Sequence, residues 1–181
     1  MENTENLAWS VDQIHSRIGF SVRHMVVSEA IGHFNSFKVN VSSPKDSFEG
    51  SHIEVIIDAK SIDTGMPDRN GHLMSDDFFN VEKFPEIKFV GTTFVKTGEE
   101  SFKLSGDLTI RDITKKIDLD VVHGGQIVDP YGYVRTGFKV TGNINRLDFD
   151  LKWNALLETG SAILGKIVSF SCDIELVRPN N

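Results

Sequence analysis

Cysteine is almost absent from the sequence, and proline, tyrosine and tryptophan are scarce. The 181 residues include one cysteine, Cys172, so the chain cannot form an internal disulfide. A lone cysteine is also consistent with a reducing compartment. No run of residues approaches the eighteen or so apolar positions of a membrane-spanning helix. Any contact with a membrane is therefore expected to be peripheral.

Positive charge is in short supply. Lys and Arg number 19 against 26 Asp and Glu, which leaves a formal net charge of −7. Because no basic stripe is present to neutralise phosphates, nucleic acid is not an expected partner. The opening residues, MENTENLAWSVD, have neither the positive nor the apolar region of a secretory signal. This predicts a cytoplasmic protein.

Phenylalanine, in contrast, is abundant: 13 Phe accompany 2 Tyr and 2 Trp. Because Phe adds apolar area without a polar tip to satisfy, this bias suits a large dry interior. Hydrophobic residues make up 39% of the chain and charged residues 25%, as in a soluble globular protein. The length predicts that residues 1–181 form a single domain.

Alternation of apolar and polar residues is the dominant pattern. In HSRIGFSVRHM, Ile18, Phe20 and Val22 fall on one face, as in a strand that is buried on one side. Seven more segments alternate in the same way: FKVNVS, HIEVIIDAK, EIKFVGTTF, SFKLSGDLTIRD, KIDLDVV, YVRTGFKVTGNI and IVSFSCDIEL. Eight short strands with polar outer faces predict an all-β antiparallel fold, either a sandwich or a closed barrel.

Turn residues separate the predicted strands. Clusters of Gly, Pro and Asp at 43–46, 97–99, 124–125 and 129–132 are predicted hairpin connections. The period of two is lost in MPDRNGHLMSDDFFNVEKFP, between the third and fourth predicted strands. Pro67 suits the first turn of a helix, and Ser75-Asp76-Asp77 could cap a second turn. A short helical segment that covers one end of the fold is therefore expected between strands three and four.

An eight-stranded barrel encloses room for its own side chains or for one small ligand, and alternation does not choose between them. A hollow interior here would offer almost no polar anchors, which favours a long apolar tail. Burying one methylene contributes about 0.8 kcal/mol, so about fifteen carbons gain roughly 12 kcal/mol against an association cost of ~4–15 kcal/mol. The predicted ligand contacts come from the inward faces and the helical segment: Phe20, Val22, Phe37, Val39, Val55, Ile57, Leu73, Phe78, Phe79, Phe89, Leu108, Ile110 and Phe138.

Motifs for catalysis or metal binding are not evident. The histidines have no ligand spacing and no partner cysteines: His15, His24, His33, His52, His72 and His123. We predict no catalytic site, no metal site and no cofactor. Arg69 and its acidic neighbours are expected to tie the helical segment to its loop. Two alternatives remain open, namely a barrel enzyme acting on a hydrophobic substrate and a structural or interaction barrel with a filled core.

Short blocks spread over about residues 9–177 are similar to those of the YceI-like family of polyisoprenoid-binding proteins. The blocks are Trp9-Ser10-Val11-Asp12, His15-Ser16, Phe20-Ser21-Val22-Arg23-His24, Gly32-His33-Phe34, Ser61-Ile62-Asp63-Thr64, Arg69, His72-Leu73, Asp77-Phe78-Phe79-Asn80, Phe84-Pro85-Glu86-Ile87-Lys88-Phe89, Gly106-Asp107-Leu108-Thr109-Ile110, Thr114-Lys115 and Ile144-Asn145-Arg146. Their combined order is far more specific than any one of them. The resemblance implies an extended lipocalin-like fold, an eight-stranded antiparallel β-barrel.

The same resemblance implies a function. It suggests a bore that holds the isoprenoid chain of a quinone or polyprenol, with no catalytic constellation. The identity of the ligand comes from the resemblance alone, because alternation does not distinguish one long apolar tail from another. The expected protein is a cytoplasmic isoprenoid carrier. The tail length, the head group and the formation of a homodimer are left open.

Overall fold

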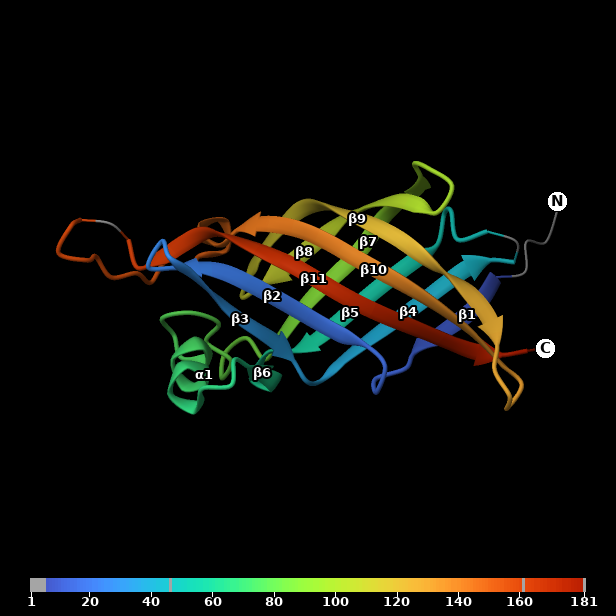
Figure 1. The fold of residues 1–181 in the computed structure, drawn as a ribbon, viewed down its shortest axis with the longest axis horizontal. Coiled ribbons are helices and arrows are strands. Elements are labelled where there is room, and N and C mark those ends of the chain that lie inside the picture. The colour runs from blue at the N-terminus through green and yellow to red at the C-terminus, as the bar shows by residue number, and fades with distance from the viewer. Residues whose placement is uncertain (1–5, 46, 161, 181) are drawn as a thin grey trace.

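The structure is a computed structural model that describes residues 6–45, 47–160 and 162–180. Its strands are β1 (Asn6–Val11), β2 (Arg17–His24), β3 (Ser28–Phe34), β4 (Phe37–Pro44), β5 (His52–Asp58), β6 (Ile62–Asp63), β7 (Glu86–Lys96), β8 (Ser101–Ile110), β9 (Ile113–Val128), β10 (Tyr133–Asn145) and β11 (Leu164–Pro179). The helical elements are α1 (Pro67–Met74) and two short 3₁₀ helices, η1 (Ala59–Ser61) and η2 (Arg146–Phe149). Figure 1 shows an elongated barrel with α1 beside one end.

Eight of the strands form a closed ring. Hydrogen-bonded neighbours follow the order β1-β4-β5-β7-β8-β9-β10-β11, and a pairing of β1 with β11 closes the ring. Every pairing is antiparallel. The predicted all-β, eight-stranded antiparallel barrel is confirmed, and closure removes the exposed sheet edges that an open sandwich would leave.

Strand β11 is long enough to carry two neighbours on one edge. Its C-terminal end pairs with β1, where Ser10 lies opposite Val177, and its N-terminal half pairs with β2, where Ser21 lies opposite Ser169. Strand β3 then pairs with β2, and the short β6 pairs with β3. The wall of the barrel is thereby extended toward α1 (Figure 1).

Alternation did not predict β1, β3 or β6, although it located the other strands. Strand β3 places Ala30, Gly32 and Phe34 on its less exposed face, so most of that face carries no large apolar side chain. Gly32 lies opposite Phe20, and a Cβ atom on Gly32 would come within 2.4 Å of that ring. The absence of a side chain there makes room for the aromatic ring, and the usual signature of a strand is lost.

The predicted helical segment is confirmed as α1, between the third and fourth of the predicted strands. Pro67 occupies the first turn, where its missing N–H has no partner to lose. Arg69 donates from Nε to the hydroxyl of Thr64 at 2.9 Å and from Nη2 to the carbonyl of Thr64 at 2.9 Å. Asn70 donates to Asp63 at 3.1 Å. These contacts attach α1 to the end of β6, as expected for Arg69.

One predicted hairpin connection is wrong. Gly124 and Gly125 lie inside β9, and the ladder with β10 continues past them to Val128. Gly125 has φ of +110°, and the register shifts between Gly137 and Phe138 on the partner strand. The glycines therefore lie at a β-bulge, where Gly125 adopts a positive φ at no steric cost. The connections at 97–99 and 129–132 are turns as predicted, and the predicted turn at 43–46 includes residue 46, which lies outside the described residues.

Within the described part of the chain, no helix has the length and apolarity that crossing a membrane requires.

Candidate functional site

The interior of the barrel contains an elongated cavity of about 230 Å³. This exceeds the roughly 150 Å³ of an engineered apolar cavity that stays dry and binds benzene. Every strand of the ring except β1 contributes to its wall, together with β2 and β3. The cavity is lined by Ile18, Gly19, Phe20, Val22, Phe34, Val39, Val41, Phe48, Ser51, Ile53, Val55, Ile57, Leu73, Phe78, Phe79, Ile87, Phe89, Phe94, Leu104, Leu108, Ile110, Ile117, Leu119, Val121, Phe138, Val140, Ile144, Arg146, Leu151, Val168, Phe170, Cys172, Ile174 and Leu176. The core is therefore hollow rather than filled.

The predicted ligand contacts line this cavity, with the exception of Phe37. Phe37 points inward as predicted, opposite Ile57, but it is the first residue of β4 and is buried among core side chains at the end of that strand. Its expected place on the cavity wall is therefore corrected. Three inward residues, Phe20 on β2, Val55 on β5 and Phe138 on β10, are only half-buried because they face open space.

Several lining residues were missing from the predicted set. Phe34 lies on β3, which carries no alternating pattern, and Phe48 and Leu151 lie in connections where periodicity gives no signal. Phe170 and Cys172 lie on the inward face that alternation predicts for β11. Their orientation was therefore predicted correctly, although they were not included among the predicted ligand contacts.

Exposure of the lining changes along the bore. Near α1, Val22 and Val168 lie directly opposite each other and are half-buried. Toward the other end, Val41, Val121 and Leu176 are buried. The lining formed by β2 and β11 is therefore less buried near α1 than these three residues are at the other end.

An aromatic cluster closes the far end. Phe48, from the connection between β4 and β5, lies 5.0 Å from the ring of Phe138, 5.2 Å from His123 and 5.6 Å from Trp9. His123 shares a hydrogen bond of 2.8 Å with Thr136. Burial lowers the pKa of His123, so its neutral form is favoured in this apolar setting. The cluster fills the bore between the strands that it joins.

The segment containing α1 covers part of the opposite end of the bore, as the sequence predicts. Leu73 of α1 and Phe78 and Phe79 of the following turns line the cavity. His72 packs edge-on against Phe78, with ring centroids 5.1 Å apart, and against Trp153, with centroids 4.6 Å apart. Because Trp153 belongs to the connection between η2 and β11, this packing joins two segments that border the same end.

Polar side chains on the cavity wall form hydrogen bonds within the protein. The hydroxyl of Ser51 donates to the carbonyl of Phe48. Arg146, which is 2% exposed, donates only to backbone carbonyls and forms no ion pair among the described residues. Burial raises the pKa of the Cys172 thiol to about 11, so the thiol is neutral at physiological pH. The wall thus offers a ligand almost no free hydrogen-bonding group.

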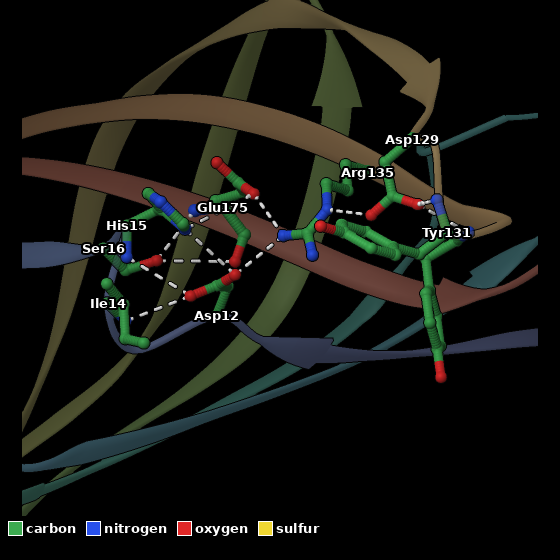
Figure 2. A network of polar contacts seen from close by, with 9 residues as sticks. Asp12, Ile14, His15, Ser16, Asp129, Tyr131, Arg135 and Glu175 are labelled. Atoms are coloured by element: carbon green, nitrogen blue, oxygen red, sulfur yellow. Dashed lines mark hydrogen bonds and ion pairs between the residues drawn. The ribbon is translucent and has the colours of Figure 1, made fainter.

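A separate polar network lies at the end of the barrel away from α1 (Figure 2). Arg135 on β10 donates from Nη1 to Asp12 and to Glu175, both at 2.7 Å, and from Nε to Asp129 at 2.6 Å. His15 Nδ1 lies 3.1 Å from the same oxygen of Asp12. One cation therefore joins the turn after β1, the hairpin between β9 and β10, and strand β11.

Asp12, His15 and Glu175 have the chemistry of metal ligands, and one donor atom from each lies within 4.8 Å of the others. Arg135 already donates to one carboxylate oxygen of Asp12 and to one of Glu175. Its positive charge occupies this cluster and opposes the binding of a cation there. The sequence did not predict this cluster, because Glu175 is far from Asp12 and His15 along the chain.

Asp12 gives the network a defined dependence on pH. Hydrogen bonds from His15 and Arg135 lower the pKa of Asp12 to about 2, below the value of about 3.9 expected in the unfolded chain. Its contribution to stability is complete above the unfolded-state pKa and is lost as the pH falls through about 2. We expect Asp12→Asn to unfold more easily in urea at pH 7 and to lose stability less steeply than the wild type between pH 4 and pH 2.

Asparagine retains the side-chain oxygen that accepts from the backbone N–H of Ile14. It removes the charge together with the oxygen that accepts from Arg135 and contacts His15. Asp112→Asn, at an exposed position, is the control. Parallel urea midpoints of Asp12→Asn and the wild type across this pH range would contradict the assignment.

Comparisons with known proteins place this architecture in a family. The YceI-like domain family matches residues 9–176. A UPF0312 protein of Staphylococcus aureus is 38% identical over 168 residues, which cover 92% of this chain and 95% of that relative. A Campylobacter jejuni YceI protein of known structure has a TM-score of 0.75 and 28% identity, and the match covers 86% of this chain and 89% of that one.

A polyisoprenoid-binding domain from Saccharophagus degradans, which is implicated in plant cell wall breakdown, has a TM-score of 0.68 and 17% identity over 96% of this chain and 99% of that one. At this identity the likeness concerns the fold alone. The family match, in contrast, extends over nearly the whole chain, and the staphylococcal relative is similar over most of its own length. The chain therefore belongs to the YceI-like family.

Proposed function

We propose that the protein binds and carries a long-chain isoprenoid lipid, a polyprenol or an isoprenoid quinone, in the bore of the barrel and without catalysis. The observation that carries this proposal is the hollow, apolar interior, with an open volume of about 230 Å³. A filled structural barrel has no such space, so the cavity disfavours that alternative.

The chemistry of the wall supports an apolar tail. Ser51 and Arg146, which have polar side chains, satisfy them on the backbone, and the Cys172 thiol is uncharged. A small polar metabolite would lose its hydrogen bonds to water and find no replacement, at a cost of about 1–3 kcal/mol for each buried group. A hydrocarbon loses nothing of this kind and gains about 0.8 kcal/mol for each methylene that it buries.

The isoprenoid identity is supported by the polyisoprenoid-binding domain that shares this fold. Area alone favours any long apolar chain, including a fatty acyl chain. Branched isoprenoid tails suit a bore walled by branched and aromatic side chains, but packing of this kind adapts to many shapes. The experiment described next distinguishes an isoprenoid from a fatty acyl ligand.

Cys172 offers a direct test, because it is the one cysteine of the chain and it lines the bore. The purified protein is extracted with organic solvent, the extract is examined by mass spectrometry, and the lipid-free protein is then mixed with a polyprenol, a quinone or a fatty acid in detergent. We expect extraction to release an isoprenoid, and reloading with the polyprenol or quinone to slow modification of Cys172 by a small uncharged thiol reagent at least tenfold.

The matched control moves the thiol to the outer face of the same strand. In Cys172→Ala/Ser171→Cys, the new thiol is at an exposed position, and reloading should not change its rate of modification. A folded wild type that yields no lipid and whose Cys172 is modified equally fast with and without isoprenoid would end the carrier proposal. If only the fatty acid protects Cys172 from modification, the ligand of the bore is a fatty acyl chain and not an isoprenoid.

A further inference from the structure

The turn between β2 and β3 combines backbone strain with exposed apolar side chains. Met25 and Val26 have φ of 52° and 65°, in the left-handed region that glycine and asparagine occupy far more readily. A β-branched residue such as Val26 is a clear exception there. Val27, the next residue, is 86% exposed. A tight hairpin turn requires positive φ at two successive residues, which explains the backbone but not why Met and Val stand where glycine or asparagine would be less strained.

A second apolar tip lies beside this turn. The backbone N–H of Met25 donates to the carbonyl of Ile163 at 2.7 Å, which joins the turn to the connection between η2 and β11. Leu156, in that connection, is 72% exposed. We call Met25, Val26, Val27 and Leu156 the apolar rim. Figure 1 shows the β2–β3 turn and this connection extending from the end of the barrel that carries α1.

The apolar rim adjoins the α1 end of the bore. His24, directly before the turn, lies opposite Leu164, and the next inward pair, Val22 and Val168, lines the cavity. Leu164 therefore places an apolar side chain between the rim and the cavity wall, opposite the imidazole of His24. A lipid tail that leaves a bilayer at the rim would reach the bore with little exposure to water.

The shape and charge of the rim fit a bilayer. The β2–β3 turn and the η2–β11 connection project from the end of the barrel (Figure 1). Projecting turns can insert into a soft surface, whereas a protein partner would need matching hollows. In the two segments that carry the rim, residues 23–29 and 150–166, three basic residues (Arg23, Lys152 and Lys166) are matched by three acidic ones (Glu29, Asp150 and Glu158). With no net charge on this surface, apolar insertion rather than attraction to anionic head groups is the driving force.

We propose that the apolar rim inserts into the surface of a lipid bilayer, where the protein loads or releases its ligand. This inference rests on the proposed carrier function. It predicts that the protein binds vesicles of phosphatidylcholine alone, and that an added anionic lipid or higher salt changes this binding little.

The test is flotation of the protein with phosphatidylcholine vesicles. In Met25→Asn/Val26→Gly, the turn receives residues that accept its conformation, so this variant should melt no lower than the wild type. We expect it to bind vesicles about tenfold or more weakly, because two apolar side chains are lost from the contact. The matched control is Ile127→Asn/Val128→Asn, which removes two exposed apolar residues at the opposite end of the barrel and should bind vesicles normally.

Loading of a polyprenol from detergent separates this inference from the carrier proposal. All variants should load equally, since none of these residues lines the bore. A protein that loads from detergent but does not bind vesicles, or a rim variant that binds them as the wild type does, would overturn the rim proposal alone. Loss of vesicle binding in the control variant would mean that the opposite end of the barrel contacts the bilayer, and this result would also overturn the rim proposal. Failure to load from detergent would reject the carrier proposal.

Discussion

Val55→Trp is expected to abolish lipid binding while the barrel stays folded. Val55 is an inward, half-buried residue of β5, and it lies opposite Phe89 on β7. An indole at this position would fill open space within the bore without adding a charge. We expect the isoprenoid recovered by extraction to fall at least tenfold, and the free energy of unfolding to fall by no more than about 1–3 kcal/mol.

The matched control is Val90→Trp, next to Phe89 on the same strand but exposed on the outer wall. This variant should carry as much lipid as the wild type. Quantitative mass spectrometry of the extracts gives lipid per protein, and urea denaturation gives stability. Full lipid content in a folded Val55→Trp protein would place the ligand somewhere other than this bore.

Arg146→Met is expected to cause the largest loss of stability. Arg146 donates from Nε to the carbonyl of Gly165 at 2.7 Å, and from Nη1 to the carbonyls of Leu151 and Trp153, the latter at 2.9 Å. Burial lowers its pKa, because no carboxylate among the described residues compensates the charge. Methionine would fill much of the volume but leave these carbonyls without donors.

Each buried carbonyl that loses its donor costs about 1–3 kcal/mol, and relief from burying the cation offsets part of the total. We therefore expect the free energy of unfolding to fall by roughly 3–5 kcal/mol, as measured by urea denaturation. Arg146→Lys should recover little of it, because one ammonium cannot reach the same set of carbonyls. Arg17→Met, at an exposed position of β2, should change stability by no more than about 0.5 kcal/mol. Equal denaturation midpoints for Arg146→Met and the wild type would contradict a structural role for this cation.

Arg146 stabilises a segment that borders the bore. It joins both ends of the connection that carries Trp153 and Leu156, and it lies on the cavity wall. Because Trp153 packs against His72, the same connection also supports the segment at the α1 end of the bore. The sequence identified Arg146 only through its place in a family block, since an arginine after a strand is ordinarily a surface residue.

Alternation by itself determined which faces of most strands point inward. Successive side chains of a strand point to opposite sides, so a sequence such as that of β11 specifies the orientation of Val168, Phe170 and Cys172 without reference to any other strand. Pro67 likewise located the start of α1 from its own backbone geometry. These are local properties, and the structure confirms both the strand faces and the helix.

Only the tertiary structure decided whether the barrel is hollow. The cavity volume depends on how closely inward side chains from strands far apart in the sequence approach one another. Alternation gives the direction of each side chain but not the distance between opposite walls. The same applies to Phe48, which closes one end from a connection, and to Arg135, which joins acidic groups from three separate segments. Residues 25–27 show most clearly what the sequence does not reveal. Their apolar character is visible in the sequence, but their exposure and strain arise only once β2 and β3 pair.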